Sequence, residues 1–117
     1  MALRDLKKRL TATVEELDDQ RLQQRFTGID LTPIAEAPTR VPIRVGGEVQ
    51  RIRMVPRAGS PSIEVVVSDG TGDVIAVFTG RRSIGGVDHG RGILLEGVGV
   101  PDRGRTVIFN PAYTLLP

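Results

Sequence analysis

The residues of this chain that could do chemistry are mostly arginines. All ten basic residues after position 39 are Arg, and the same stretch holds seven acidic residues. A guanidinium group donates paired hydrogen bonds to phosphate oxygens and stacks on flat rings, so it suits contacts with nucleic acid. A GC-rich coding bias would also favour Arg over Lys. On charge asymmetry alone, nucleic-acid binding and coding bias explain the arginines equally well.

Other kinds of chemistry lack the residues they need. A zinc site takes about four nitrogen or sulfur ligands, but the chain has one histidine and no cysteine. His89 lies in a glycine-rich loop, where a solvated side chain is expected. Neither G-x-x-x-x-G-K-[ST] nor G-x-S-x-G occurs, and Ser83 has no neighbouring base to activate it. We therefore expect no enzyme activity, no catalytic residue, no metal site and no cofactor.

The clearest element is a β-hairpin over residues 65–78, which read V-V-V-S-D-G-T-G-D-V-I-A-V-F. Two runs of β-branched residues suit a half-buried pleated surface. Between them, Gly70 and Gly72 supply the positive φ angles of a tight turn. Asp69 is expected to organise this turn by accepting hydrogen bonds from backbone N–H groups.

The orientation of Phe78 decides whether the hairpin offers an aromatic platform. Ile75 and Val77 share one face of the second strand, and their β-branching suits the core. That choice would turn Phe78 outward, where bases stack. The opposite phase, with Phe78 in the core, carries equal weight.

The N-terminal residues 1–27 predict an amphipathic helix from about residue 2 to residue 24. The spacing 3, 4, 4, 3 lines one helix face with Leu3, Leu6, Leu10, Val14 and Leu17. A break near Leu17 stays open. This stripe is expected to cover the chain's own body or a second copy, in preference to a foreign partner. A homo-oligomer through this helix is therefore one expectation.

The first residues also bear on location. Arg4 precedes any apolar run, so no signal peptide is expected. No apolar run reaches the roughly 20 residues of a membrane span. Together with the lack of cysteine, these features favour a cytoplasmic protein that does not contact membranes.

After a proline-containing connector over residues 28–41, the pattern changes to short strands. A long first strand covers residues 43–54, and its apolar residues change from one face of the strand to the other partway along. Gly46-Gly47 offers a place for the bend this requires. Further strands follow at 62–68, 73–79, 92–100 and 105–110, and Ile84 is expected to close one end. The prediction is an all-β fold with an N-terminal α-helix, a five-stranded OB-fold barrel over residues 42–117.

Three strings carry a resemblance: S-D-G-T-G-D-V-I-A-V-F, G-R-R-S-I-G-G-V-D-H-G-R-G-I-L-L-E-G-V and N-P-A-Y-T-L-L. Over residues 42–116 the chain resembles the nucleic-acid-binding OB family that includes the wedge domain of RecG-type helicases and the tRNA-anticodon-binding domains. It is most similar to stand-alone actinobacterial OB-fold proteins with an N-terminal helix. The resemblance implies nucleic-acid binding without helicase activity, because the motor domains are absent.

An OB barrel binds across strands two and three, between the loops that follow strands one and four. The candidate site residues near this face are Arg51, Arg53, Arg57, Phe78, Arg81, Arg82, Arg103 and Arg105. Few aromatic residues are present, so binding is expected to be weak or to depend on arginine. Single-stranded or branched DNA is the favoured partner, and RNA stays open. The alternative is a protein-interaction module that uses the N-terminal helix and the barrel surface.

Overall fold

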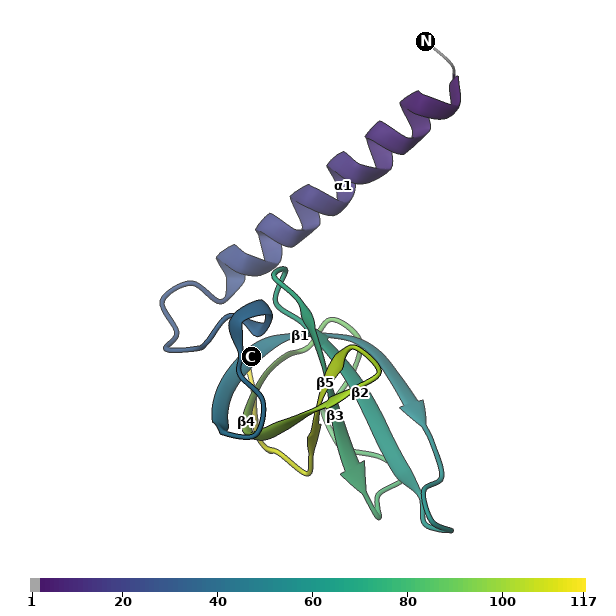
Figure 1. Cartoon of the computed structure of the whole chain (residues 1–117), viewed down its shortest axis with the longest axis vertical. Coiled ribbons are helices and arrows are strands. Elements are labelled where there is room, and N and C mark those ends of the chain that lie inside the picture. The colour runs from purple at the N-terminus through teal and green to yellow at the C-terminus, as the bar shows by residue number, and fades with distance from the viewer. Residues whose placement is uncertain (1–2) are drawn as a thin grey trace.

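The computed structural model describes residues 3–117, without the side chains of residues 3–9, 11 and 12. A long helix, α1 (Leu3–Arg25), precedes a 3-10 turn, η1 (Ile34–Glu36). The strands are β1 (Pro42–Met54), β2 (Ser62–Ser68), β3 (Asp73–Thr79), β4 (Gly92–Asp102), β5 (Arg105–Phe109) and β6 (Ala112–Leu115). Figure 1 shows α1 pointing away from the β body, with only its C-terminal end beside the strands.

The hairpin predicted around Asp69 is formed by β2 and β3, which pair antiparallel from Ser62↔Thr79 to Ser68↔Asp73. The Asp69 carboxylate accepts hydrogen bonds from the backbone N–H groups of Thr71 and Gly72, at 2.9 and 3.2 Å. Its other oxygen accepts one from the N–H of Ile34, at 2.9 Å. Asp69 therefore holds both the turn and the connector, which confirms and extends its predicted role.

Strand β1 changes partner along its length. Residues 42–48 pair with β4, and residues 48–54 pair with β2. The glycine pair lies at this change, where the strands approach so closely that a Cβ on Gly47 would be 2.3 Å from the carbonyl oxygen of Ser68. The register shift occurs later, between Val49 and Arg51, where Gln50 has no partner in β2. The glycines therefore permit the close crossing, and the bulge at Gln50 produces the phase slip.

The strands close into a ring in the order β1-β2-β3-β5-β4, with β4 pairing back onto β1. Only the β3–β5 pairing is parallel within the described chain. The fold is therefore mostly β, barrel-like, with an N-terminal helix. A sixth strand, which the sequence did not predict, follows β5 and pairs antiparallel with residues 93–96 of β4. The core inside the ring includes the fully buried side chains of Val45, Val65, Val67, Ala76, Ile93, Leu95 and Ile108.

Phe78 belongs to this core, with 3% of its surface exposed. Its cross-strand partner Ile63 faces inward with it, and its ring meets Tyr113 edge-on at 5.5 Å between centroids. The outward orientation of Phe78 is therefore wrong. The β-branching of Ile75 and Val77 did not decide the phase, because the outer face of the hairpin is itself partly covered: Val77 is fully buried there.

Helix α1 runs without a break through Leu17. Its C-terminal end is anchored by the buried side chains of Leu22 and Phe26. The described members of the predicted stripe, Leu10, Val14 and Leu17, are 60–66% exposed. The expectation that this stripe packs on the chain's own β body is therefore wrong for these three residues. The side chains of Leu3 and Leu6 lie outside the described ones.

The connector lies on the body as an anchored strap. Ile34 is buried in the core cluster, and the N–H of Thr32 bonds the carbonyl of Arg44 at 2.9 Å. Ile84 also joins the core, as expected for a residue that closes one end of the ring. Among the described residues, no helix is both long and apolar enough to cross a membrane.

Candidate functional site

A surface pocket of about 370 Å³ lies on the outer face of β2 and β3, between the loop after β1 and the turn after β4. Cross-strand neighbours share a face in an antiparallel pair, so this face is continuous from β1 to β3. Three of the predicted site residues line the pocket. Its lining consists of Arg53, Val55, Pro56, Arg57, Glu64, Ile75, Asp102, Arg103 and Val107.

Arg57 is positioned by a tight turn at one edge of this pocket. Its backbone exchanges hydrogen bonds with Ser60 at 2.8 and 2.9 Å, and Ala58 and Gly59 between them both have positive φ. That combination is the two-residue hairpin turn that matches strand twist. The Arg57 guanidinium lies 5.6 Å from the centroid of the Phe109 ring. Its Nε is buried without a hydrogen-bond partner among the described residues.

Glu64 forms ion pairs with two arginines that line the pocket, Arg53 and Arg57. Its oxygens bond Arg57 at 3.2 Å and Arg53 at 3.4 Å. The carboxylate is 12% exposed, whereas the arginine side chains are about half exposed. Ion pairs of this exposure contribute about 0–1 kcal/mol. Glu64 therefore orients the two guanidinium groups, each of which uses one terminal nitrogen in this contact.

Arg103 occupies the opposite edge, in a second two-residue turn. Arg103 and Gly104 both have positive φ, and the turn joins the paired residues Asp102 and Arg105. Arg105 shares the strand parity of Val107, which lines the pocket, so it begins the same outer face. Asp102 places a negative charge beside Arg103 and reduces the positive charge of this edge.

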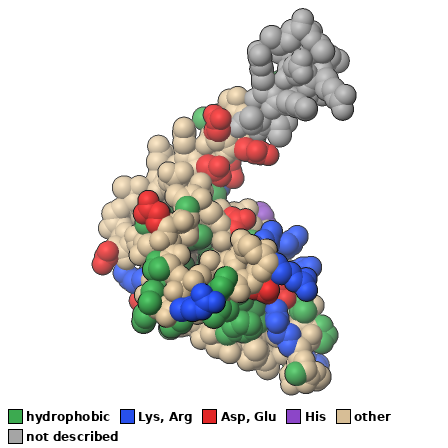
Figure 2. All heavy atoms as spheres, viewed as in Figure 1, with side chains coloured by type: hydrophobic (Ala, Val, Ile, Leu, Met, Phe, Trp, Pro, Cys, Tyr) green, Lys and Arg blue, Asp and Glu red, His purple; other side chains and the backbone are tan. Residues whose placement is uncertain are grey.

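Arg51 extends the basic surface along β1. It lies opposite Val66 of β2, as Arg53 lies opposite Glu64. The register shift at Gln50 places both arginines on the outer face. Figure 2 shows several Arg side chains along one side of the β body and others elsewhere on this view, while several acidic side chains lie on α1.

Sequence reasoning missed one residue of this face. Phe109 is 46% exposed at the end of β5, directly beside Arg57. The signal was the alternation in β5, where Val107 and Phe109 share a face and the buried Ile108 takes the other. Phe109 therefore replaces Phe78 as the exposed ring of the candidate site.

Two predicted arginines lie elsewhere. Arg81 and Arg82 follow β3 in an exposed loop. Arg82 lines a different pocket, of about 300 Å³, beside the apolar side chains of Ile52, Met54 and Ile84. Neither arginine is among the residues that line the pocket between the two turns. The structure does not bring them together with Arg57.

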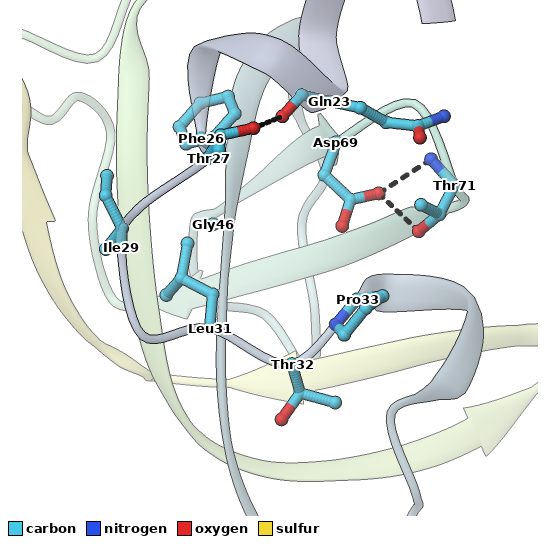
Figure 3. A pocket seen from close by; sticks show the side chains of 10 residues that line it. All are labelled: Gln23, Phe26, Thr27, Ile29, Leu31, Thr32, Pro33, Gly46, Asp69 and Thr71. Carbon is cyan, nitrogen blue, oxygen red and sulfur yellow. Dashed lines mark hydrogen bonds between the residues drawn. The ribbon is translucent and has the colours of Figure 1, made fainter. Parts of the chain in front are cut away.

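A further pocket, of about 260 Å³, lies between the end of α1, the connector and the β2–β3 turn (Figure 3). Asp69 is the one charged residue in its lining. Both carboxylate oxygens of Asp69 already accept hydrogen bonds from Ile34, Thr71 and Gly72. These bonds tie Asp69 to the turn and to the connector, so its charge serves the fold.

The one strong charge cluster of the described chain joins α1 to the ring. The buried Glu48 carboxylate accepts hydrogen bonds from Arg21, at 2.8 Å, and from Arg25, at 2.6 Å. The hydrogen bond from Arg21 lowers the pKa of Glu48 most; burial opposes this, and Arg25 lowers it further. The same contact raises the pKa of Arg21. All three groups are committed to one another, so the cluster anchors the helix.

Metal binding finds no support in the residues described: no group of three or more His, Cys, Asp or Glu side chains could hold an ion. Neither the protein-family models nor the curated proteins searched gives a match to this chain.

Proposed function

We propose that this chain is an OB-fold protein that binds single-stranded nucleic acid on the outer face of β2 and β3, without catalysis. The observation that carries this proposal is that Arg53, Arg57, Arg103 and the exposed Phe109 meet on one face between two turns. A single-strand reader combines a cationic groove with aromatic rings on which bases stack. Because the proposed ligand is nucleic acid, we place its action in the cytoplasm.

The strand order supports the OB assignment. A five-strand ring with a long first strand that pairs with both β2 and β4 is the arrangement expected of this partly open barrel. In OB folds the ligand lies across strands two and three, flanked by the loops after strands one and four. The pocket of this chain has that placement. The narrower likeness to helicase wedge and anticodon-binding domains stays part of the proposal.

The composition of the face predicts modest affinity. One exposed ring gives one base about 1–3 kcal/mol of stacking. Glu64 and Asp102 offset part of the positive charge of Arg53, Arg57 and Arg103. We expect micromolar binding at low salt. Contacts from three arginines predict a slope of log K against log salt of about −2 for a single strand.

The test is fluorescence anisotropy of labelled single-stranded DNA, duplex DNA and RNA over a salt series. Arg57→Ala should weaken single-strand binding about three- to tenfold and flatten the salt slope by about 0.7. Arg81→Ala is the matched control, because it removes the same charge outside the pocket. Equal effects of the two variants, or no anisotropy change with any of the three ligands at low salt, would refute this placement of the site. The second outcome would favour the protein-interaction alternative, which the exposed apolar residues of α1 also support.

A further inference from the structure

The described part of α1 presents an apolar seam that no other described residue covers. Leu10, Val14 and Leu17 are 66%, 65% and 60% exposed. Leu22, which docks the helix on the ring, lies about 120° away around the helix axis at 100° per residue, and Phe26 follows the last residue of α1. Figure 1 shows this part of α1 projecting clear of the strands. The docking face and the exposed seam are therefore separate faces of one helix.

The spacing of the seam reads the same in both directions. Counting from Leu3, the steps to Leu6, Leu10, Val14 and Leu17 are 3, 4, 4 and 3. A second copy of the helix that runs antiparallel and is centred on Leu10 would therefore place apolar residues opposite one another along the whole seam. Steps of three and four residues keep all five side chains on one face of the helix, and two helices pack through faces of this kind.

The charges of α1 favour that direction. Residues 4–9 carry four basic residues and one acid, whereas residues 15–19 carry four acids and no base. An antiparallel pair sets each basic block at the same level along the axis as an acidic block of the partner. A parallel pair sets like charges together along both blocks. Charge complementarity across helix pairs sets partner choice and orientation.

The antiparallel alignment also leaves the docked end of the helix free. The paired segment ends where the partner's helix begins opposite Leu17. Arg21, which bonds Glu48, lies beyond it, so pairing does not compete with the contact to the ring. The two rings then lie at opposite ends of the pair. Such a contact is closed by a two-fold axis and does not extend into fibres.

We propose that α1 pairs with α1 of a second copy of this chain, antiparallel and centred on Leu10, to form a homodimer. The paired segment is about 22 Å long. An interface of that length is small, so the dimer is expected to dissociate on dilution. This proposal uses only the helix and is independent of what the ring binds.

Sedimentation equilibrium over a range of concentrations tests the association. The wild-type chain should shift from 12.7 kDa toward about twice that mass. Leu10→Glu with Leu17→Glu should abolish the shift, because each added charge would be buried in the seam. Gln20→Glu, an exposed position outside the paired segment, adds a carboxylate and should leave the mass unchanged. A monomer at every concentration, or a dimer that the double substitution leaves intact, would overturn the proposal.

The direction is tested by disulfide cross-linking, because the chain has no cysteine of its own. Leu6→Cys and Val14→Cys are made in separate chains. An antiparallel pair centred on Leu10 should cross-link only when the two variants are mixed. Cross-linking of each variant with itself, but not in the mixed pair, would show a parallel dimer and contradict the proposal. Oligonucleotide binding per chain, measured on the Leu10→Glu, Leu17→Glu variant, separates a failed dimer from a failed binding site.

Discussion

At the scale of single residues, Phe109 and Arg57 are in contact but should leave different signatures. Phe109→Leu removes the stacking surface without removing charge. We therefore expect it to lower single-strand affinity by about 1–2 kcal/mol while the salt slope stays as in the wild type. Arg57→Ala should change the slope as well. Anisotropy titrations over the same salt series distinguish the two. A salt slope that changes with Phe109→Leu would mean that the ring acts only by positioning Arg57.

The residues of this face show how far the sequence could lead. The placement of Arg57 and Arg103 in the loops after β1 and β4 was predictable, because glycine marks both turns and the apolar pattern marks the strands beside them. Phe78 was not, because both faces of β3 are apolar and only the closed ring decides which face is inside. Phe109 was hidden by the same ambiguity in a strand of five residues. Strand parity is a reliable guide only where one face is polar.

Glu48 predicts how stability depends on pH. Its pKa is lowered in the folded chain, first by the hydrogen bond from Arg21. The ordinary value for Glu is about 4.3. The contribution of this contact is therefore present above about pH 4.3 and is lost as the pH falls through the lower pKa of the folded state. Stability should decline through that acid range.

The measurement is urea unfolding followed by circular dichroism, since the chain has no tryptophan. Glu48→Gln should lower the free energy of unfolding by about 1–3 kcal/mol at pH 7, and the difference should shrink at pH 3. Glu96→Gln is the control, because Glu96 pairs with Arg44 at 2.9 Å in an exposed position and should change stability by about 0–1 kcal/mol. A difference between Glu48→Gln and wild type that does not shrink in acid would contradict the linkage.

At the scale of elements, the crossing of β1 over the end of β2 depends on the absence of a side chain. A Cβ at Gly47 would lie 2.3 Å from the oxygen and 2.6 Å from the carbon of the Ser68 carbonyl. These are backbone atoms of a paired strand and cannot move alone. Gly47→Ala should therefore lower the free energy of unfolding by about 2 kcal/mol or more. In Gly85→Ala, the new Cβ meets nothing within 4 Å, so this variant should stay within about 0.5 kcal/mol of the wild type. Equal stability of the two variants in urea would show that the crossing relaxes freely.

Local signals predicted the elements better than they predicted their partners. The hairpin turn at Asp69 and the helix from Leu3 follow from turn chemistry and from periodicity. The strand β6 has only four residues, and what makes it a strand is the edge of β4 beside it. The bulge at Gln50 also depends on register with β2, which no local pattern encodes. The apolar stripe of α1 was found correctly, but its described members do not pack on the chain's own β body, and the second copy stays a prediction.

At the scale of the whole molecule, two parts meet at one joint. The joint consists of two buried side chains, Leu22 and Phe26, and of two ion pairs, in which Arg21 and Arg25 both contact Glu48. The rest of α1 projects beyond it (Figure 1). We infer that the ring needs the joint for stability but does not need the projecting part. Binding should then belong to the ring, and association to the projecting helix.

Two truncations separate these roles. Removing residues through 20 keeps the joint, so the ring should retain its stability and its oligonucleotide affinity but stay monomeric. Removing residues through 27 also exposes the apolar surface under Leu22 and Phe26 and removes both arginine partners of Glu48. That loss should cost about 3 kcal/mol or more. Urea unfolding and sedimentation measure both effects on the same preparations. Equal stability of the two truncated chains would show that the joint does not stabilise the ring. A loss already present in the shorter truncation would mean that the projecting helix supports the ring through contacts of its own.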